Sequence, residues 1–180
     1  RLRLAQYLVA ENPVNLVAFG LFALLVLAAI IGPFVAPYSP LSTDTSIALP
    51  PPSSLHWFGT DQLGRAVFSR VLVATRLDLC IAFSAVTLSC IVGSVIGAMI
   101  GYYGGWLDAT VSRCVDILMA FPLFVLAMAV VAALGNTIMN VVYATAVINL
   151  PFYIRLARAE INVRRSLGYV EAARVGGSGD

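Results

Sequence analysis

Long stretches without a charged residue alternate with short polar segments along this chain. No Asp, Glu, Lys or Arg occurs in residues 12–43, 79–107 or 117–154. An α-helix needs about 20 apolar residues to cross a bilayer, so each of the first two stretches predicts one span. The third is too long for one helix and is interrupted by Gly135-Asn136-Thr137, so it predicts two spans. The predicted spans cover 14–35, 79–100, 111–134 and 138–157.

Composition places the chain among membrane proteins. Of its 180 residues, 60% are hydrophobic and 11% are charged, whereas a soluble domain carries about a quarter charged residues. We therefore expect an all-α membrane protein. The first apolar stretch is too long for a signal-peptide core and lacks a convincing cleavage site, so it is expected to stay as a membrane anchor.

The arginines predict the orientation. The chain contains no lysine, and its basic residues gather after the fourth predicted span and before the first. Because basic residues concentrate in cytoplasmic loops, we expect 1–13, 101–110 and 158–180 to be cytoplasmic and 36–78 to be external. Arg65, Arg70 and Arg76 favour the opposite orientation, but they form the smaller cluster. The net charge of +2 gives no indication of nucleic-acid binding.

The sequence offers few residues that could bind a metal ion or act in catalysis. The cysteines, Cys80, Cys90 and Cys114, lack metal-ligand spacing, and His56 is the only histidine. A metal site normally requires several ligands, so we expect no metal site and interpret the cysteines as small apolar residues of the helices. No catalytic residue is predicted.

The external segment combines prolines with an amphipathic stretch. Thr60 or Asp61 can cap a helix start, and Leu63, Val67 and Val71 follow on one face. This pattern predicts a helix over 61–76 that lies in the membrane interface.

Part of this segment resembles a family signature. The pattern Gly-Thr-Asp-x-x-Gly-Arg-Asp-x-x-Ser-Arg is typical of the C-type permease subunit of dipeptide, oligopeptide and nickel importers, and the paired B-type subunit lacks it. Ala66 stands where that pattern has aspartate. The matching residues are Gly59, Thr60, Asp61, Gly64, Arg65, Ser69 and Arg70.

A second resemblance lies near the end of the chain. The EAA loop of binding-protein-dependent ABC importers reads Glu-Ala-Ala, three residues, then Gly, and it couples the permease to its ATPases. Gly176 departs from the family, which has an apolar residue there. By resemblance, the coupling residues are Tyr169, Val170, Glu171, Ala172, Ala173 and Gly177.

The predicted spans carry several packing features. Arg113 and Asp116 are three residues apart on one helix face and are expected to form a structural ion pair. Pro122 and Pro151 are expected to kink their helices, and Asn149 offers a hydrogen-bond partner across the bundle. Small residues recur every four positions and predict close packing against a neighbouring helix. They are Ala85, Ser89, Gly93, Gly97 and Gly101.

Taken together, the resemblance implies the transmembrane-domain fold of a type I ABC importer, with four of the family's usual six helices. It implies a fragment of a bacterial inner-membrane permease that pairs with a homologous B-type permease. A periplasmic binding protein would deliver a di- or oligopeptide or a nickel-like solute. Two ATP-binding subunits would use ATP and Mg²⁺, so the chain itself needs no cofactor and is not an enzyme.

Two other classes of protein share features with this sequence. Gly177-Ser178-Gly179-Asp180 fits the Gly-x-Gly-Asp string of intramembrane aspartyl proteases, but no second aspartate lies in a matching span. Such enzymes need two aspartates to share acid and base roles. A channel or structural membrane protein agrees with the composition, and only the two family motifs argue against it.

Overall fold

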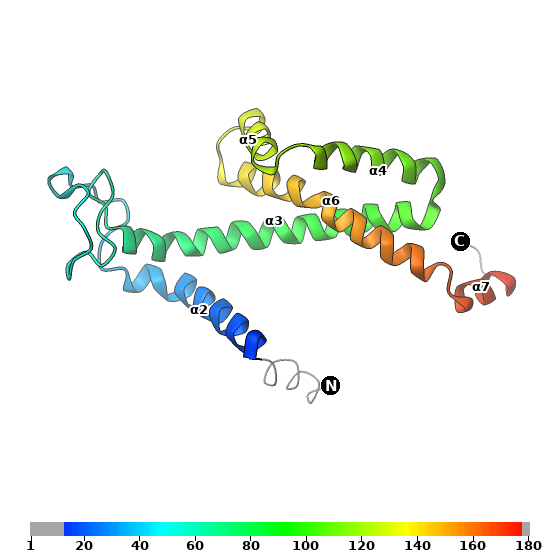
Figure 1. The fold of residues 1–180 in the computed structure, drawn as a ribbon, viewed down its shortest axis with the longest axis horizontal. Coiled ribbons are helices and arrows are strands. Elements are labelled where there is room, and N and C mark those ends of the chain that lie inside the picture. Colours follow the sequence, from blue (N-terminus) through cyan, green and yellow to red (C-terminus); the bar gives the residue numbers. More distant parts are fainter. Residues whose placement is uncertain (1–12, 178–180) are drawn as a thin grey trace. The chain divides into compact units, whose positions relative to one another are not determined.

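The computed structural model describes residues 13–177, and the whole of this range is helical or irregular (Figure 1). The only extended pairing within it is a single bridge between Thr60 and Ala66. The predicted all-α class is therefore confirmed. The elements are α2 (Pro13–Val35), the 3₁₀ turn η1 (Thr45–Ile47), α3 (Val67–Tyr103), α4 (Gly105–Ala120), α5 (Leu123–Leu134), α6 (Ile138–Arg164) and α7 (Gly168–Val175).

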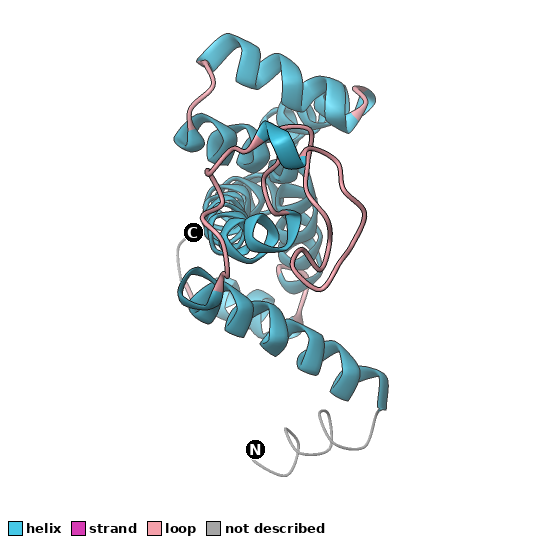
Figure 2. Cartoon of the chain, turned by 90° about the vertical axis from the view of Figure 1, so that its left-hand side faces the viewer, coloured by secondary structure: helices cyan, strands magenta, loops and turns pink. Residues whose placement is uncertain are grey.

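The chain divides into two compact units, and the boundary falls inside α3. The first unit ends at Cys80 and the second begins at Ile81. The first holds α2, the irregular segment that carries η1, and the start of α3 (Figure 2). The second holds the rest of α3 together with α4, α5, α6 and α7. Each unit is described by itself below.

Within residues 13–177, three helices are long and apolar enough to cross a membrane, namely α2, α3 and α6. A fourth span results if α4 and α5 are counted together, although they are bent by 99° relative to each other. The kink predicted at Pro122 is therefore present, but it is a full break that divides the predicted span at 111–134 between two helices. The break lies at Phe121 and Pro122, whose ψ angles are 139° and 130°. Proline disfavours the α conformation in the residue before it and lacks the N–H that would continue the helix.

The predicted interfacial helix and the second span are one continuous helix. Helix α3 begins at Val67, after the predicted start at 61, and continues without a break to Tyr103. No proline occurs between these ends, and helix propagation is cooperative once a first turn has formed. Arg76 and Asp78, which separated the two predicted elements, change the polarity of the helix surface but not its backbone.

Helix α6 also differs from its predicted form. It continues through Pro151 and ends at Arg164, beyond the predicted limit of 157. The Asn149 side chain donates to the carbonyl of Thr145 at 2.8 Å, so it binds its own helix and not a neighbour. This local hydrogen bond lies in the turn just before the proline.

Within the second unit, the predicted small-residue ladder packs against α6, as expected. Ala85 and Ser89 are completely buried, and the Ser89 hydroxyl lies 2.7 Å from the Ala146 carbonyl of α6. A Cβ added at Gly93 would lie 2.7 Å from Cβ of Tyr153. The backbones of α3 and α6 can approach this closely only because the ladder residues are small.

A second buried cluster joins α3, α4 and α6. It consists of Ile100, Val115 and Ile154, with Leu107, Val111 and Leu150 partly buried around it. The carboxyl half of α3, α4 and α6 therefore pack around one buried cluster, and α5 packs against α6 (Figure 1).

Candidate functional site

Asp61 is the centre of the signature segment in the first unit. Its Oδ1 accepts hydrogen bonds from the backbone N–H of Leu63 at 2.9 Å and of Arg65 at 3.0 Å. Its Oδ2 accepts from Nε of Arg65 at 2.8 Å and from the guanidinium of Arg70. The Arg65 side chain contributes most to holding the pKa of Asp61 far below its ordinary value. The carboxylate is therefore ionised and fixes a turn.

This geometry corrects the predicted helix cap. Asp61 closes a turn that ends before the helix, and α3 starts only at Val67. The backbone N–H of Gly64 donates to the Asp61 carbonyl at 2.9 Å, and that of Asp61 donates to the Arg65 carbonyl at 3.0 Å. Because Gly64 has a φ of +71°, helix geometry cannot pass through it.

Both signature glycines lie where a side chain would collide with a neighbouring backbone. A Cβ at Gly59 would lie 2.6 Å from the Pro50 carbonyl oxygen. A Cβ at Gly64 would overlap the carbonyl of Asp44. Gly59 also has a positive φ of +70°. Glycine is therefore required at both positions for conformation and for space.

The remaining signature residues attach this turn to its surroundings. The Thr60 hydroxyl donates to the Ile47 carbonyl, and the hydroxyl of Ser69 accepts from the backbone N–H of Tyr38 at 3.2 Å. Thr60 and Ser69 are both buried. Ala66 is only 6% exposed, so a small apolar side chain fits the place of the family's aspartate. All seven signature residues thus hold one folded loop together.

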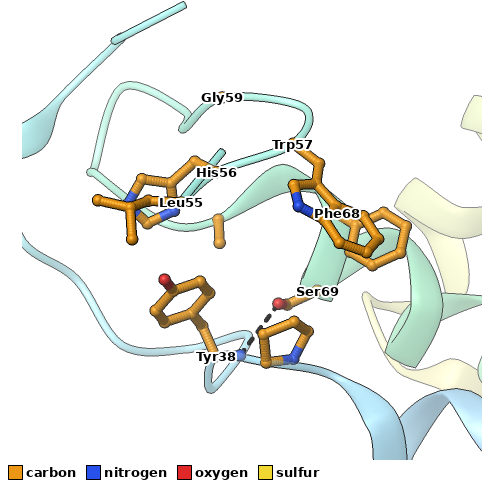
Figure 3. A pocket seen from close by; sticks show the side chains of 9 residues that line it. Tyr38, Leu55, His56, Trp57, Gly59, Phe68 and Ser69 are labelled. Carbon is orange, nitrogen blue, oxygen red and sulfur yellow. Dashed lines mark hydrogen bonds between the residues drawn. The ribbon is translucent and has the colours of Figure 1, made fainter. Parts of the chain in front are cut away.

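A small aromatic cavity lies beside this loop (Figure 3). It has a volume of about 20 Å³, which is room for one water molecule. The rings of Tyr38 and His56 lie 4.9 Å apart, and those of Trp57 and Phe68 lie 5.0 Å apart. The buried Nδ1 of His56 has no hydrogen-bond partner among the described residues.

The predicted coupling segment forms the short helix α7 in the second unit. Tyr169, Glu171, Ala172 and Ala173 are exposed, and Val170 is half-buried. Glu171 lies in the first turn, where a negative charge suits the helix dipole. Most of the surface of α7 is therefore exposed, including the aromatic ring of Tyr169 and the carboxylate of Glu171.

Gly177 and Ser166 lie just beyond the two ends of α7. Gly177 follows the helix with a φ of +87° and has open space around its Cα, so glycine suits the backbone that ends the helix. The Ser166 hydroxyl donates to the Val163 carbonyl of α6 at 2.9 Å and does not cap α7. Residues 178–180 of the aspartyl-protease-like string lie outside the described residues, as do 1–12 of the amino-terminal segment.

Ion pairs join α4 to α6 in an arrangement that the sequence did not predict. Asp116 binds Arg155 at 2.6 Å and not Arg113, so the expected pair within one helix is wrong. Asp108 binds Arg158, with Nη2 and Oδ2 2.7 Å apart. Partners 39 and 50 residues apart carry no local spacing signal. The sequence shows only that acidic residues occur on the α4 segment and basic residues on the α6 segment.

No group of three or more His, Cys, Asp or Glu side chains that could hold a metal ion occurs within residues 13–177. The two candidate functional regions are the hydrogen-bonded signature loop around Asp61 and the exposed helix α7.

Comparison with known proteins finds two family matches, which lie on either side of the signature loop at residues 59–70. Residues 93–180 match the binding-protein-dependent transport system inner membrane component, and residues 9–52 match the N-terminal TM domain of oligopeptide transport permease C. The α7 region falls inside the first match.

Whole-chain relatives agree with these matches. A probable D,D-dipeptide transport system permease protein from Escherichia coli (strain K12) is 37% identical over 96% of this chain and 58% of its own length. A dipeptide transport system permease protein from Alkalihalophilus pseudofirmus is 38% identical over 93% of this chain and 55% of its own.

A glutathione transport system permease protein from Pectobacterium atrosepticum is 41% identical over 91% of this chain and 55% of its own length. The chain thus spans a little over half the length of these relatives. Its apolar helices, its loop signature and its family matches lead to one conclusion. The chain belongs to the family of binding-protein-dependent ABC transporter permeases, of the oligopeptide permease C type.

Proposed function

We propose that this chain acts as a non-catalytic permease subunit of an ABC importer, and that α7 is the surface to which an ATP-binding subunit docks. The observation that carries the proposal is the exposure of the Glu-Ala-Ala helix directly after the last long apolar helix. Tyr169 is 66% exposed and Val175 is 89% exposed. Exposed apolar side chains that gather on one short helix favour a protein partner.

The chemistry of α7 suits docking against a basic surface. Glu171 supplies a negative charge, and Ala172 and Ala173 leave the helix surface flat. A partner helix or cleft can therefore approach the backbone closely without displacing bulky side chains. An unpaired charge at such an interface costs several kcal/mol because it is desolvated without compensation. An oversized side chain is unfavourable because it overlaps the partner.

The remaining partners follow from the same proposal. A homologous B-type permease completes the translocation path, and a periplasmic binding protein delivers the solute. Two ATP-binding subunits supply energy with ATP and Mg²⁺, since this chain has no lysine for a nucleotide-binding P-loop. The relatives named for dipeptides and glutathione support a short peptide as the solute, ahead of nickel.

Membrane placement also belongs to the proposal. The protein resides in a bacterial inner membrane with both described ends in the cytoplasm and the signature loop outside. The arginines after α6 support this orientation. The folded loop around Asp61 would then face the binding protein.

The test places charge-reversing variants in the complete transporter. Glu171→Lys should leave membrane insertion unchanged and should reduce both transport and the co-purification of the ATP-binding subunits by at least tenfold. Glu160→Lys is the matched control, because Glu160 is also exposed and pairs only with Arg164 of its own helix. Normal transport with the ATP-binding subunits still attached to the Glu171→Lys variant would refute docking at α7.

A further inference from the structure

Arg165 caps a helix to which it does not belong. It is the residue at the carboxyl end of α6, yet its Nη1 lies 3.3 Å from the Gly101 carbonyl and 3.2 Å from the Tyr102 carbonyl of α3. These two carbonyls are separated from Arg165 by more than sixty residues of chain. The contact therefore joins the ends of two long helices.

The carboxyl end of α3 provides a favourable site for a guanidinium. The last four carbonyls of a helix have no partner within the helix, and the helix dipole places partial negative charge there. The chain reverses at Gly104, which has a φ of +64°. A Cβ added at Gly104 would lie 3.4 Å from Nη1 of Arg165. A planar guanidinium with several N–H donors can bind two adjacent carbonyls at once.

A second contact holds the other side of the same turn. Asp108, in the first turn of α4, binds Arg158 of α6 and also accepts from the Ser112 hydroxyl at 3.1 Å. The backbone of Arg158 in turn packs against Gly101, where an added Cβ would lie 2.9 Å from the Arg158 carbonyl oxygen. The last turns of α6 therefore contact the α3–α4 turn at two points, through Arg165 and through Arg158.

These contacts lie immediately before the proposed docking helix. Only Ser166 and Leu167 separate Arg165 from the start of α7 at Gly168. The Ser166 hydroxyl is bound to Val163 of α6, and the N–H of Leu167 donates to the Arg164 carbonyl at 3.1 Å. The connection between Arg165 and α7 is thus short and internally hydrogen-bonded.

We infer that Arg165 is a positioning residue that fixes α7 to the carboxyl end of α3, so that a displacement of α7 is passed directly to α3. The inference rests on the proposed docking function of α7 and adds the route by which docking reaches a membrane-spanning helix. Helix α3 is the 37-residue helix that carries the small-residue ladder against α6. A movement at its end is therefore transmitted along a rigid, closely packed element.

Arg164 provides a matched control one residue earlier. It pairs with Glu160 of its own helix at 3.2 Å, and both side chains are largely exposed. Neutralising Arg164 removes the same charge at the same end of α6 without touching α3. Any effect that needs the contact with α3 should therefore separate Arg165→Gln from Arg164→Gln.

The first measurement follows hydrogen–deuterium exchange in the full chain and needs no ATPase. Arg165→Gln should speed the exchange of the amides of residues 168–175 by roughly tenfold or more, which is the effect expected for losing hydrogen bonds to a charged group. Arg164→Gln should leave these rates within a factor of two. Equal exchange in the two variants would overturn the inference, whatever α7 binds.

The second measurement uses the complete transporter and compares transport with ATP hydrolysis. Arg165→Gln should keep the ATP-binding subunits attached and hydrolysing ATP while solute transported per ATP falls about fivefold. Arg165→Lys, which retains a donor for one carbonyl, should recover part of this ratio. Loss of ATPase attachment in Arg165→Gln, or an unchanged ratio, would contradict a positioning role. Failure of docking itself is detected separately by Glu171→Lys.

Discussion

Replacing Gly97 with alanine tests the close packing of α3 against α6. An added Cβ would first meet the carbonyl oxygen of Ile154, and it would lie 2.8 Å from Cβ of Ala157 and 3.1 Å from the backbone N of Arg158. Carbon atoms in contact are normally about 3.5–4.0 Å apart. The two helices must therefore separate by about 1 Å, because backbone atoms of α6 cannot rotate out of the way.

The expected cost follows from three contributions. Overpacking of a close contact costs about 1–3 kcal/mol. Loss of the hydrogen bond between Ser89 and Ala146, which spans 2.7 Å between the same helices, adds about 0.6 kcal/mol. The higher helix propensity of alanine recovers up to about 1 kcal/mol. We expect Gly97→Ala to lower the free energy of unfolding by about 0.6–2.6 kcal/mol.

Gly20 in α2 supplies the control, because it is also inside a long apolar helix but has no atom within 4 Å of an added Cβ. Gly20→Ala should be neutral or should stabilise the chain by up to about 1 kcal/mol. Reversible unfolding by sodium dodecyl sulfate in a mild detergent, followed by circular dichroism, measures both variants. If Gly97→Ala unfolds at the same denaturant fraction as Gly20→Ala, the ladder does not pack as described.

Three further predictions address the loop, the topology and the energy source. Asp61 has a lowered pKa, so its ionic contribution to the stability of the loop is present above about pH 4 and is lost as the pH falls below that value. The difference in unfolding free energy between wild type and Asp61→Asn should therefore shrink below about pH 4. A constant difference from about pH 7 to about pH 2 would contradict the loop geometry. Single cysteines at Ser42 and Ser166 in a cysteine-free chain should react with an impermeant thiol reagent from opposite sides of the membrane, and labelling from one side would reverse the proposed topology. The purified chain should hydrolyse no ATP by itself, and sustained turnover in a preparation free of other subunits would show that energy does not come from a partner.

Sequence periodicity and composition were sufficient for the fold class but not for the helix limits. The apolar stretch at 14–35 became α2 almost residue for residue, because it is apolar apart from Asn15 near its start. Charges at Arg76 and Asp78 suggested a boundary, whereas the interruptions near both ends of α3 and after α4 coincide with a positive φ or a proline. The breaks occur at Gly64, Gly104 and Pro122, where those conditions are met.

Residues of the candidate sites were recognised, but their physical roles depended on contacts between distant segments. Asp61 was expected to cap a helix and instead closes a turn with Arg65 and Arg70. Asp116 was paired with a neighbour three residues away and instead binds Arg155 of another helix. Gly177 was identified by resemblance, and its positive φ gives a conformational reason for a glycine there. Such roles depend on which distant segments come together in the tertiary structure, and the spacing of residues along the sequence does not give that information.

Site-specific photocrosslinking from α7 tests the central claim most directly. A benzoylphenylalanine at Tyr169 of the assembled transporter should form an adduct with an ATP-binding subunit. The same probe at Phe152 of α6, which is 65% exposed against 66% for Tyr169, lies in an apolar helix and should form none. Adducts with the ATP-binding subunit from position 152 but not from 169, or from neither, would contradict docking of that subunit on α7.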